Sequence, residues 1–126
     1  MIPKRILLIE DDPDIQRLLG LTLQLTAGAE VQSATEGQDG ITLAVDWQPE
    51  LILLDRMLPD MEGTAVLQAL KANPATSTIP VIFLSARAGE AEIIAAISKG
   101  AVGYIVKPFD PMGLAGEIAR ILEGAR

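Results

Sequence analysis

Apolar residues follow two different rhythms along this chain, and the two rhythms alternate. Four short apolar runs are uninterrupted, as expected of strands buried on both faces of a sheet; they cover residues 6–9, 51–54, 81–84 and 104–106. A fifth segment, residues 30–34, mixes apolar with polar residues and predicts a strand at the edge of the sheet. Between the strands, apolar residues recur at spacings of three and four, which predicts amphipathic helices. The chain therefore reads as five strand–helix repeats.

Residues that begin and end helices support these boundaries. Asp12 can cap the first predicted helix, with Pro13 at its first position, where a missing amide hydrogen costs nothing. Gly28 and Gly100 can end helices by adopting a positive φ. The length of 126 residues and the apolar content of 49% suit one core between two helical layers. We therefore predict an α/β fold of the doubly wound type, with a single domain over residues 1–126.

Composition excludes several functions. The chain has no cysteine and no histidine, which excludes disulfides, zinc sites built on these residues and Ser-His-Asp triads. Its net charge of −7 opposes direct contact with nucleic acid. Its apolar stretches are far shorter than the roughly 20 residues that a membrane-spanning helix needs, and its first residues lack the apolar core of a secretory signal. We expect a cytoplasmic protein with neither a nucleic-acid nor a membrane partner.

Polar side chains stand directly after four of the predicted strands. Glu10 and Asp11 follow the first strand, Asp55 the third, Ser85 the fourth and Lys107 the fifth. If the strands are parallel, all these positions meet at the carboxyl edge of one sheet. Clustered carboxylates repel one another, and Mg²⁺, which prefers oxygen ligands, relieves that repulsion. Asp55 could then attack phosphorus while Lys107 offsets negative charge and Ser85 hydrogen-bonds an oxygen, so the pattern predicts Mg²⁺-dependent phosphate chemistry.

Each of these residues taken alone also has a structural interpretation. An acid after a strand is more often a helix cap, and residues 10–12 could form a solvated acidic turn. Ser85 is more often a cap, and Lys107 a surface charge. The joint placement of the residues favours a site over these interpretations. A phosphatase with an aspartate nucleophile is disfavoured, because that class needs a second acid two positions after Asp55, where Met57 stands.

Four motifs carry a resemblance to a known family. They are ILLIEDD at residues 6–12, LILLDRMLPDMEG at 51–63, VIFLSA at 81–86 and GYIVKPF at 103–109. Because all four occur in order, the chain resembles the receiver domain of two-component response regulators, of the chemotaxis-type single-domain kind, over roughly residues 4–123. The resemblance implies a flavodoxin-like (βα)5 three-layer sandwich with a five-stranded parallel sheet of order 2-1-3-4-5.

The same resemblance implies which residues receive the phosphoryl group and bind the cofactor. Asp55 would be the phosphoacceptor. The implied cofactor is Mg²⁺, with Asp11 and Asp55 as direct ligands. Glu10 would bind the ion through water, and Met57 would bind it through its backbone carbonyl.

The resemblance further implies a switch. Ser85 and Lys107 would contact the phosphoryl group, and the peptide bond between Lys107 and Pro108 would be cis. On phosphorylation the Ser85 hydroxyl would move toward the new oxygens, and the Tyr104 ring would turn into the vacated space, although Tyr104 also fits an ordinary core position. The change would alter a face within residues 89–122, which a downstream protein would contact.

Partners and domain context are also implied. The phosphodonor would be a histidine kinase or a histidine phosphotransfer protein, and the chain would be no enzyme beyond self-catalysed phosphorylation and dephosphorylation. Met57 and Arg87 flank the site and leave the lifetime of the phosphorylated state open. Neutral residues at 101–103, Met112 and Gly116 depart from the charges of winged-helix transcription factors, which disfavours a DNA-binding parent.

We expect a single-domain receiver that signals through protein contact. Two alternatives stay open: a receiver that governs an attached effector domain, and a pseudo-receiver that binds a partner without being phosphorylated. Both a monomer and a phosphorylation-dependent dimer are compatible with the sequence.

Overall fold

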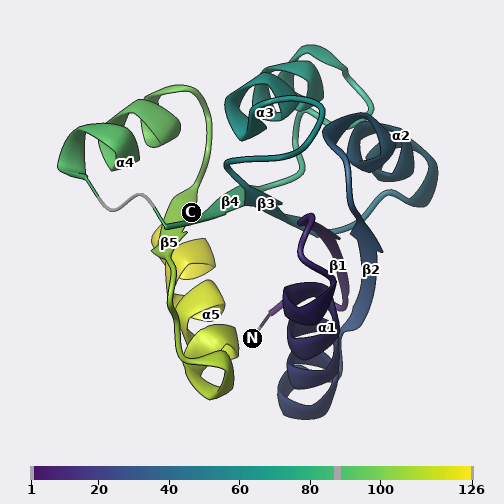
Figure 1. The fold of residues 1–126 in the computed structure, drawn as a ribbon, viewed down its shortest axis with the longest axis vertical. Helices are drawn as coiled ribbons and strands as arrows, with labels where there is room; N and C mark the ends of the chain where they lie inside the picture. The colour runs from purple at the N-terminus through teal and green to yellow at the C-terminus, as the bar shows by residue number, and fades with distance from the viewer. Residues whose placement is uncertain (1, 87–88, 126) are drawn as a thin grey trace.

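A sheet of five parallel strands lies at the centre of the protein in a computed structural model, which describes residues 2–86 and 89–125 (Figure 1). The strands are β1 (Arg5–Ile9), β2 (Glu30–Ala34), β3 (Leu51–Asp55), β4 (Val81–Ser85) and β5 (Gly103–Val106). Their order in the sheet is β2-β1-β3-β4-β5. This order confirms the expected topology and the placement of β2 at an edge.

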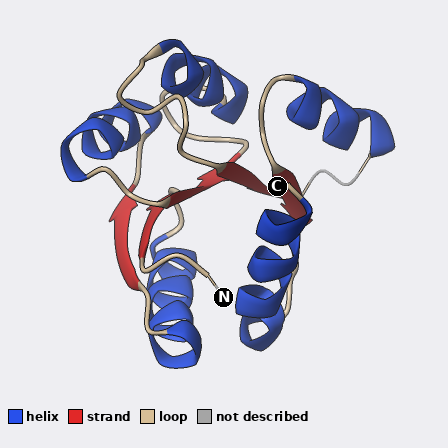
Figure 2. Cartoon of the chain, turned by 180° about the vertical axis from the view of Figure 1, so that it is seen from behind, coloured by secondary structure: helices blue, strands red, loops and turns tan. Residues whose placement is uncertain are grey.

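Helices cover both faces of the sheet, which gives the three expected layers (Figures 1 and 2). The helices are α1 (Pro13–Ala27), α2 (Gly37–Trp47), α3 (Gly63–Ala72), α4 (Glu90–Ser98) and α5 (Leu114–Gly124), and a 3-10 turn, η1 (Pro111–Gly113), precedes α5. The helices α1 and α5 pack on one face, and α2, α3 and α4 pack on the other. Within the described residues, no helix is both long and apolar enough to cross a membrane.

The core is split into two halves by the sheet. Alternate residues of β1 enter opposite halves: Leu7 and Ile9 pack with α2, α3 and α4, whereas Ile6 and Leu8 pack with α1 and α5. All four side chains are fully buried. Because both faces of the strand are covered, every position is apolar, which explains the uninterrupted run in the sequence.

The boundaries of the elements follow the predicted signals with two exceptions: the strands β3 and β4 end one residue later than predicted, and a 3-10 turn precedes the last helix. Asp12 caps α1 by accepting a hydrogen bond from the backbone N–H of Asp14 at 2.9 Å. The strands β3 and β4 each run one residue beyond their apolar runs, because Asp55 and Ser85 continue the backbone ladder. The turn η1 was not predicted from the sequence; it is capped by Asp110, whose side chain accepts a hydrogen bond from the N–H of Met112 at 3.1 Å.

Candidate functional site

The carboxyl ends of β1, β3, β4 and β5 bring the predicted site residues to one edge of the sheet. Asp55 ends β3 and Ser85 ends β4, the neighbouring strand. The backbone N–H of Lys107 donates to the carbonyl of Ser85 at 2.7 Å, and the N–H of Glu10 donates to the carbonyl of Ala34 at 3.0 Å. Backbone hydrogen bonds at this edge of the sheet therefore hold the backbone positions from which these side chains extend.

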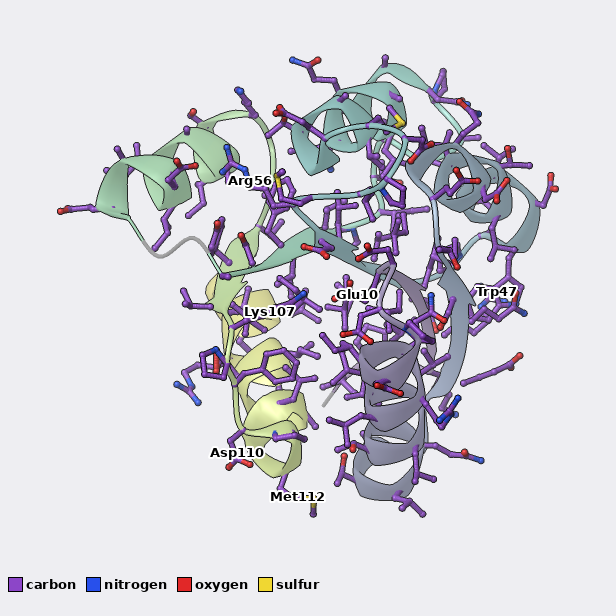
Figure 3. The ribbon with its side chains drawn as sticks, in the orientation of Figure 1. Glu10, Trp47, Arg56, Lys107, Asp110 and Met112 are labelled. Carbon is purple, nitrogen blue, oxygen red and sulfur yellow. The ribbon has the colours of Figure 1, made fainter. Side chains whose placement is uncertain are left out.

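Lys107 lies between two carboxylates. Its Nζ is 2.5 Å from Oε1 of Glu10 and 3.4 Å from Oδ2 of Asp55. Figure 3 labels Glu10 and Lys107, which point toward each other across the edge of the sheet. Glu10 is 1% exposed and Asp55 is 8% exposed, so both carboxylates are largely withdrawn from water. A buried carboxylate needs a compensating cation, and the Lys107 ammonium supplies it.

The charged groups of this cluster shift one another's pKa values. Burial raises the pKa of Glu10, and hydrogen bonding to Asp55 raises it further, while Lys107 acts in the opposite direction. The side chain of Asp11 is exposed, yet its partial desolvation raises the pKa of its carboxyl group, and hydrogen bonding to Glu10 raises it further. Burial alone would lower the pKa of Lys107, but hydrogen bonding to Glu10 and the charges of both carboxylates outweigh it, so this pKa is raised. The cluster holds more negative charge than one lysine neutralises.

Three carboxylates are close enough to share one cation. Oxygens of Glu10, Asp11 and Asp55 lie within 4.8 Å of one another. Asp11 is exposed, whereas Glu10 and Asp55 are buried. Both carboxylate oxygens of Glu10 already accept hydrogen bonds, Oε1 from Lys107 and Oε2 from the N–H of Asp12 at 3.3 Å. Hard oxygen donors with one open side suit Mg²⁺, which keeps several waters when it binds to proteins.

The remaining predicted residues lie at different distances from this cluster. The side chain of Met57 is 54% exposed, and its backbone N–H points to Oδ1 of Asp55 at 3.4 Å. The peptide bond between Lys107 and Pro108 is cis. Tyr104 lies on β5, where its ring is 6.0 Å from that of Phe83 between centroids, and it packs against the core. Arg87 lies outside the described residues.

Two further residues of the LILLDRMLPDMEG motif, Asp60 and Gly63, shape the site, and neither was predicted from the sequence to have a role there. The N–H of Gly63 donates to the carbonyl of Arg56 at 2.7 Å. A Cβ atom on Gly63 would lie only 2.5 Å from the carbonyl oxygen of Asp55, so α3 can approach the turn after Asp55 only because this residue is glycine. A glycine at the start of a predicted helix is the sequence feature that could have indicated this close contact.

Asp60 is the second such residue. Its carboxylate accepts hydrogen bonds from the backbone N–H groups of Gly37 at 2.7 Å and Gln38 at 3.0 Å. These bonds lower the pKa of Asp60. Because the Glu36 side chain makes no capping hydrogen bond within the described part of the chain, Asp60 caps α2 from the turn that follows β3. The sequence carried no signal for this contact, since cap and helix are separated by more than 20 residues.

The comparisons with known proteins agree with this geometry. A family model described as the response regulator receiver domain matches residues 6–119. The chain is 41% identical over 118 residues to the DNA-binding dual master transcriptional regulator RpaA of Synechocystis, a match that covers 94% of this chain and 48% of that protein. It is 36% identical over 122 residues to the phosphate regulon transcriptional regulatory protein PhoB of Pseudomonas aeruginosa, with coverage of 97% and 53%.

A solved structure gives the same result for the fold. The chemotaxis response regulator CheY4 of Vibrio cholerae superposes with a TM-score of 0.88 at 26% identity, over 95% of this chain and 99% of that chain. By contrast, the chain spans about half the length of the curated relatives it matches. One of these relatives is named as DNA-binding and the other as a transcriptional regulator, so the expectation against a DNA-binding parent finds no support among them.

Proposed function

Because the chain belongs to the response regulator receiver domain family, we propose that it accepts a phosphoryl group on Asp55 and passes the signal on through a change of its protein-binding surface. Accepting a phosphoryl group is the function of this family. The observation that carries the choice of residue is the position of the Asp55 carboxylate, which lies 3.4 Å from the Lys107 ammonium and within 4.8 Å of two further carboxylates.

The proposed reaction is the transfer of a phosphoryl group from a donor outside this chain to Asp55. An oxygen of Asp55 attacks phosphorus, the bond from phosphorus to the donor's leaving atom breaks, and its electron pair departs with the leaving group. With a phosphohistidine donor the leaving atom is an imidazole nitrogen, and that histidine lies outside these 126 residues, which contain none. Lys107 offsets charge on the transferred oxygens, and the Ser85 hydroxyl donates a hydrogen bond to one of them.

Mg²⁺ is the proposed cofactor. Asp11 and Asp55 would bind it directly, and Met57 would bind it through its backbone carbonyl. Glu10 would bind through water, which agrees with the hydrogen bonds that both of its oxygens already accept. A bound Mg²⁺ would offset negative charge on the transferring oxygens. The carboxylates that the chain supplies are the hard oxygen ligands that this ion prefers.

A phosphodonor protein needs a surface next to Asp55, and an apolar groove supports one. The groove has a volume of about 320 Å³ and is shared by α1, the end of β4 and the segment after β5. It is lined by Ile15, Leu18, Ala86, Lys107, Phe109 and Pro111 together with Pro108. Because Lys107 belongs both to the groove and to the cluster around Asp55, a histidine kinase or phosphotransfer protein docked there would present its phosphohistidine to Asp55.

The proposed output is the switch of Ser85 and Tyr104. Movement of the Ser85 hydroxyl toward the phosphoryl oxygens would let Tyr104 turn, which would change the face formed within residues 89–122. A single receiver domain over residues 1–126 that binds a downstream protein is one form of this output. A receiver that governs an attached effector domain is the second, and the length of RpaA and PhoB favours it.

Phosphorylation by a small donor tests the proposal. Purified protein is incubated with acetyl phosphate, with and without Mg²⁺, and its intact mass is measured. We expect one phosphoryl addition to the wild type that requires Mg²⁺, none to Asp55→Asn, and a normal addition to the control Asp39→Asn, which changes an exposed acid on α2. Undiminished addition to Asp55→Asn would overturn the assignment.

A further inference from the structure

An ion pair joins the residue after the phosphoacceptor to the first turn of α4. Nη1 of Arg56 lies 2.7 Å from Oε2 of Glu92. The two side chains are 16% and 32% exposed, so water screens the pair only partly. Figure 3 shows Arg56 extending toward α4. Within the described residues Nη1 is buried and has no partner in hydrogen-bond geometry, so charge attraction rather than an aligned hydrogen bond holds this contact.

The two ends of the pair differ in how firmly they are held. On one side, the backbone of Arg56 is fixed by α3, since its carbonyl accepts from the N–H of Gly63 at 2.7 Å. On the other side, α4 has little apolar anchorage: along its described length Glu90–Ser98 only Ala96 is buried, and Ile94 and Ile97 are 60% and 49% exposed. The ion pair therefore attaches a lightly anchored helix to a rigid turn.

We propose that Arg56 is a positioning residue, which acts through Glu92 to hold the first turn of α4 against the phosphoacceptor turn and so sets how readily α4 moves when Asp55 is phosphorylated. This inference rests on the proposed function, because it concerns the regulation of the same site. A displacement of α4 away from the turn after Asp55 lengthens the Arg56–Glu92 contact, because the backbone of Arg56 is bonded to α3 and not to α4. The ion pair thus favours the present position of α4 over a displaced one.

The expected effect follows from the shift of a two-state equilibrium. Removing an interaction that exists in one arrangement of α4 and is absent from the other changes their ratio by the full value of that interaction. For a partly exposed ion pair we expect a change of about fivefold, which corresponds to about 1 kcal/mol. Replacing either partner alone should give this change. Replacing both should give little more, because each single substitution already breaks the contact.

The experiment compares wild type with Arg56→Gln, Glu92→Gln and the double variant. Glu90→Gln is the matched control, since Glu90 also lies in the first turn of α4 and its change removes the same charge from the same helix end. Hydrogen exchange of the amides at residues 93–97 measures release of α4 without any phosphoryl group. Intact mass after acetyl phosphate treatment measures phosphorylation, and a titration with beryllofluoride and Mg²⁺, followed by NMR, measures the response of α4.

We expect α4 amides to exchange about fivefold faster in both single variants, no faster in the double variant than in the singles, and within twofold of wild type in Glu90→Gln. The beryllofluoride concentration at half-saturation should fall by a similar factor in the first three variants. Normal phosphorylation with unchanged exchange, an unchanged half-saturation, or the same effect in Glu90→Gln would overturn the role of the ion pair and leave the proposed function standing. Absence of phosphorylation in the wild type would overturn both.

Discussion

Replacing Gly63 by alanine tests whether close contact with α3 holds the turn after Asp55 in place. The added Cβ would lie 2.5 Å from the carbonyl oxygen of Asp55, 2.9 Å from Cα of Arg56 and 3.0 Å from Cε1 of Phe83. The first two are backbone atoms, so no side-chain rotation relieves the overlap. Because unstrained contacts are roughly 3.5 Å, the start of α3 and the turn must separate by about 1 Å.

The cost can be worked out from three contributions. Overpacking of this kind costs about 1–3 kcal/mol. The hydrogen bond from Gly63 N–H to the Arg56 carbonyl, 2.7 Å long, weakens as the helix withdraws, at a cost of up to about 1 kcal/mol. The lower entropy of alanine in the unfolded chain returns about 0.5 kcal/mol. The free energy of unfolding should therefore fall by about 2 kcal/mol.

Phosphorylation should fall as well, because the overlap is with Asp55 itself. A shift of about 1 Å at a reacting group can lower a rate by up to about 100-fold. Urea unfolding gives the stability, and the rate of phosphoryl addition from acetyl phosphate gives the reactivity. Gly20→Ala is the control: Gly20 lies inside α1, where an added Cβ would have no described atom within 4 Å, so this change should stabilise the protein by about 0.5–1 kcal/mol. Wild-type stability and a wild-type rate in Gly63→Ala would show that close contact with α3 does not hold the turn after Asp55 in place.

Three further substitutions probe the charges. Asp11→Asn removes an acid whose pKa is raised by folding, and such a group costs stability as pH rises through its pKa. Without Mg²⁺ the unfolding free energy of the variant should therefore exceed that of wild type by up to about 1 kcal/mol at pH 7 and by nothing in acid. The variant should also lose the rise in Tm that Mg²⁺ gives the wild type. Lys107→Ala leaves the buried Glu10 carboxylate uncompensated and raises its pKa further, so unfolding free energy measured in urea should drop by about 2 kcal/mol at pH 7 and recover on acidification. Asp60→Ala removes the cap of α2 and should lower Tm at neutral pH, with the difference vanishing as pH falls through the lowered pKa of Asp60. An equal loss of Tm in Asp39→Ala would contradict that last reasoning.

The order of elements was predicted well from the sequence, for a physical reason. Strands covered on both faces have no polar position, so each buried strand appears as an unbroken run, and the intervening helices show a different period. The ends of β3 and β4 were predicted one residue too early. Asp55 and Ser85 are polar, yet their backbones continue the sheet, and only the pairing with Leu84 and Val106 shows this.

The site was predictable as a set of residues but not as a set of contacts. Parallel strands bring their carboxyl ends to one edge, which is why Glu10, Asp55 and Lys107 could be grouped from sequence. That Lys107 lies nearer to Glu10 than to Asp55 depends on side-chain packing, which no local pattern encodes. The same holds for Arg56 and Glu92, which are far apart in sequence and meet because α4 packs on the same face of the sheet as α3.

The most direct test of the account is to locate the phosphoryl group chemically. Protein treated with acetyl phosphate and Mg²⁺ is reduced with borohydride, which converts an aspartyl phosphate to homoserine, and its peptides are then sequenced by mass spectrometry. We expect homoserine at position 55 and at no other acid of the site. Homoserine at position 11 in place of 55, or phosphoryl addition that yields no homoserine at all, would contradict the assignment of Asp55 as the phosphoacceptor.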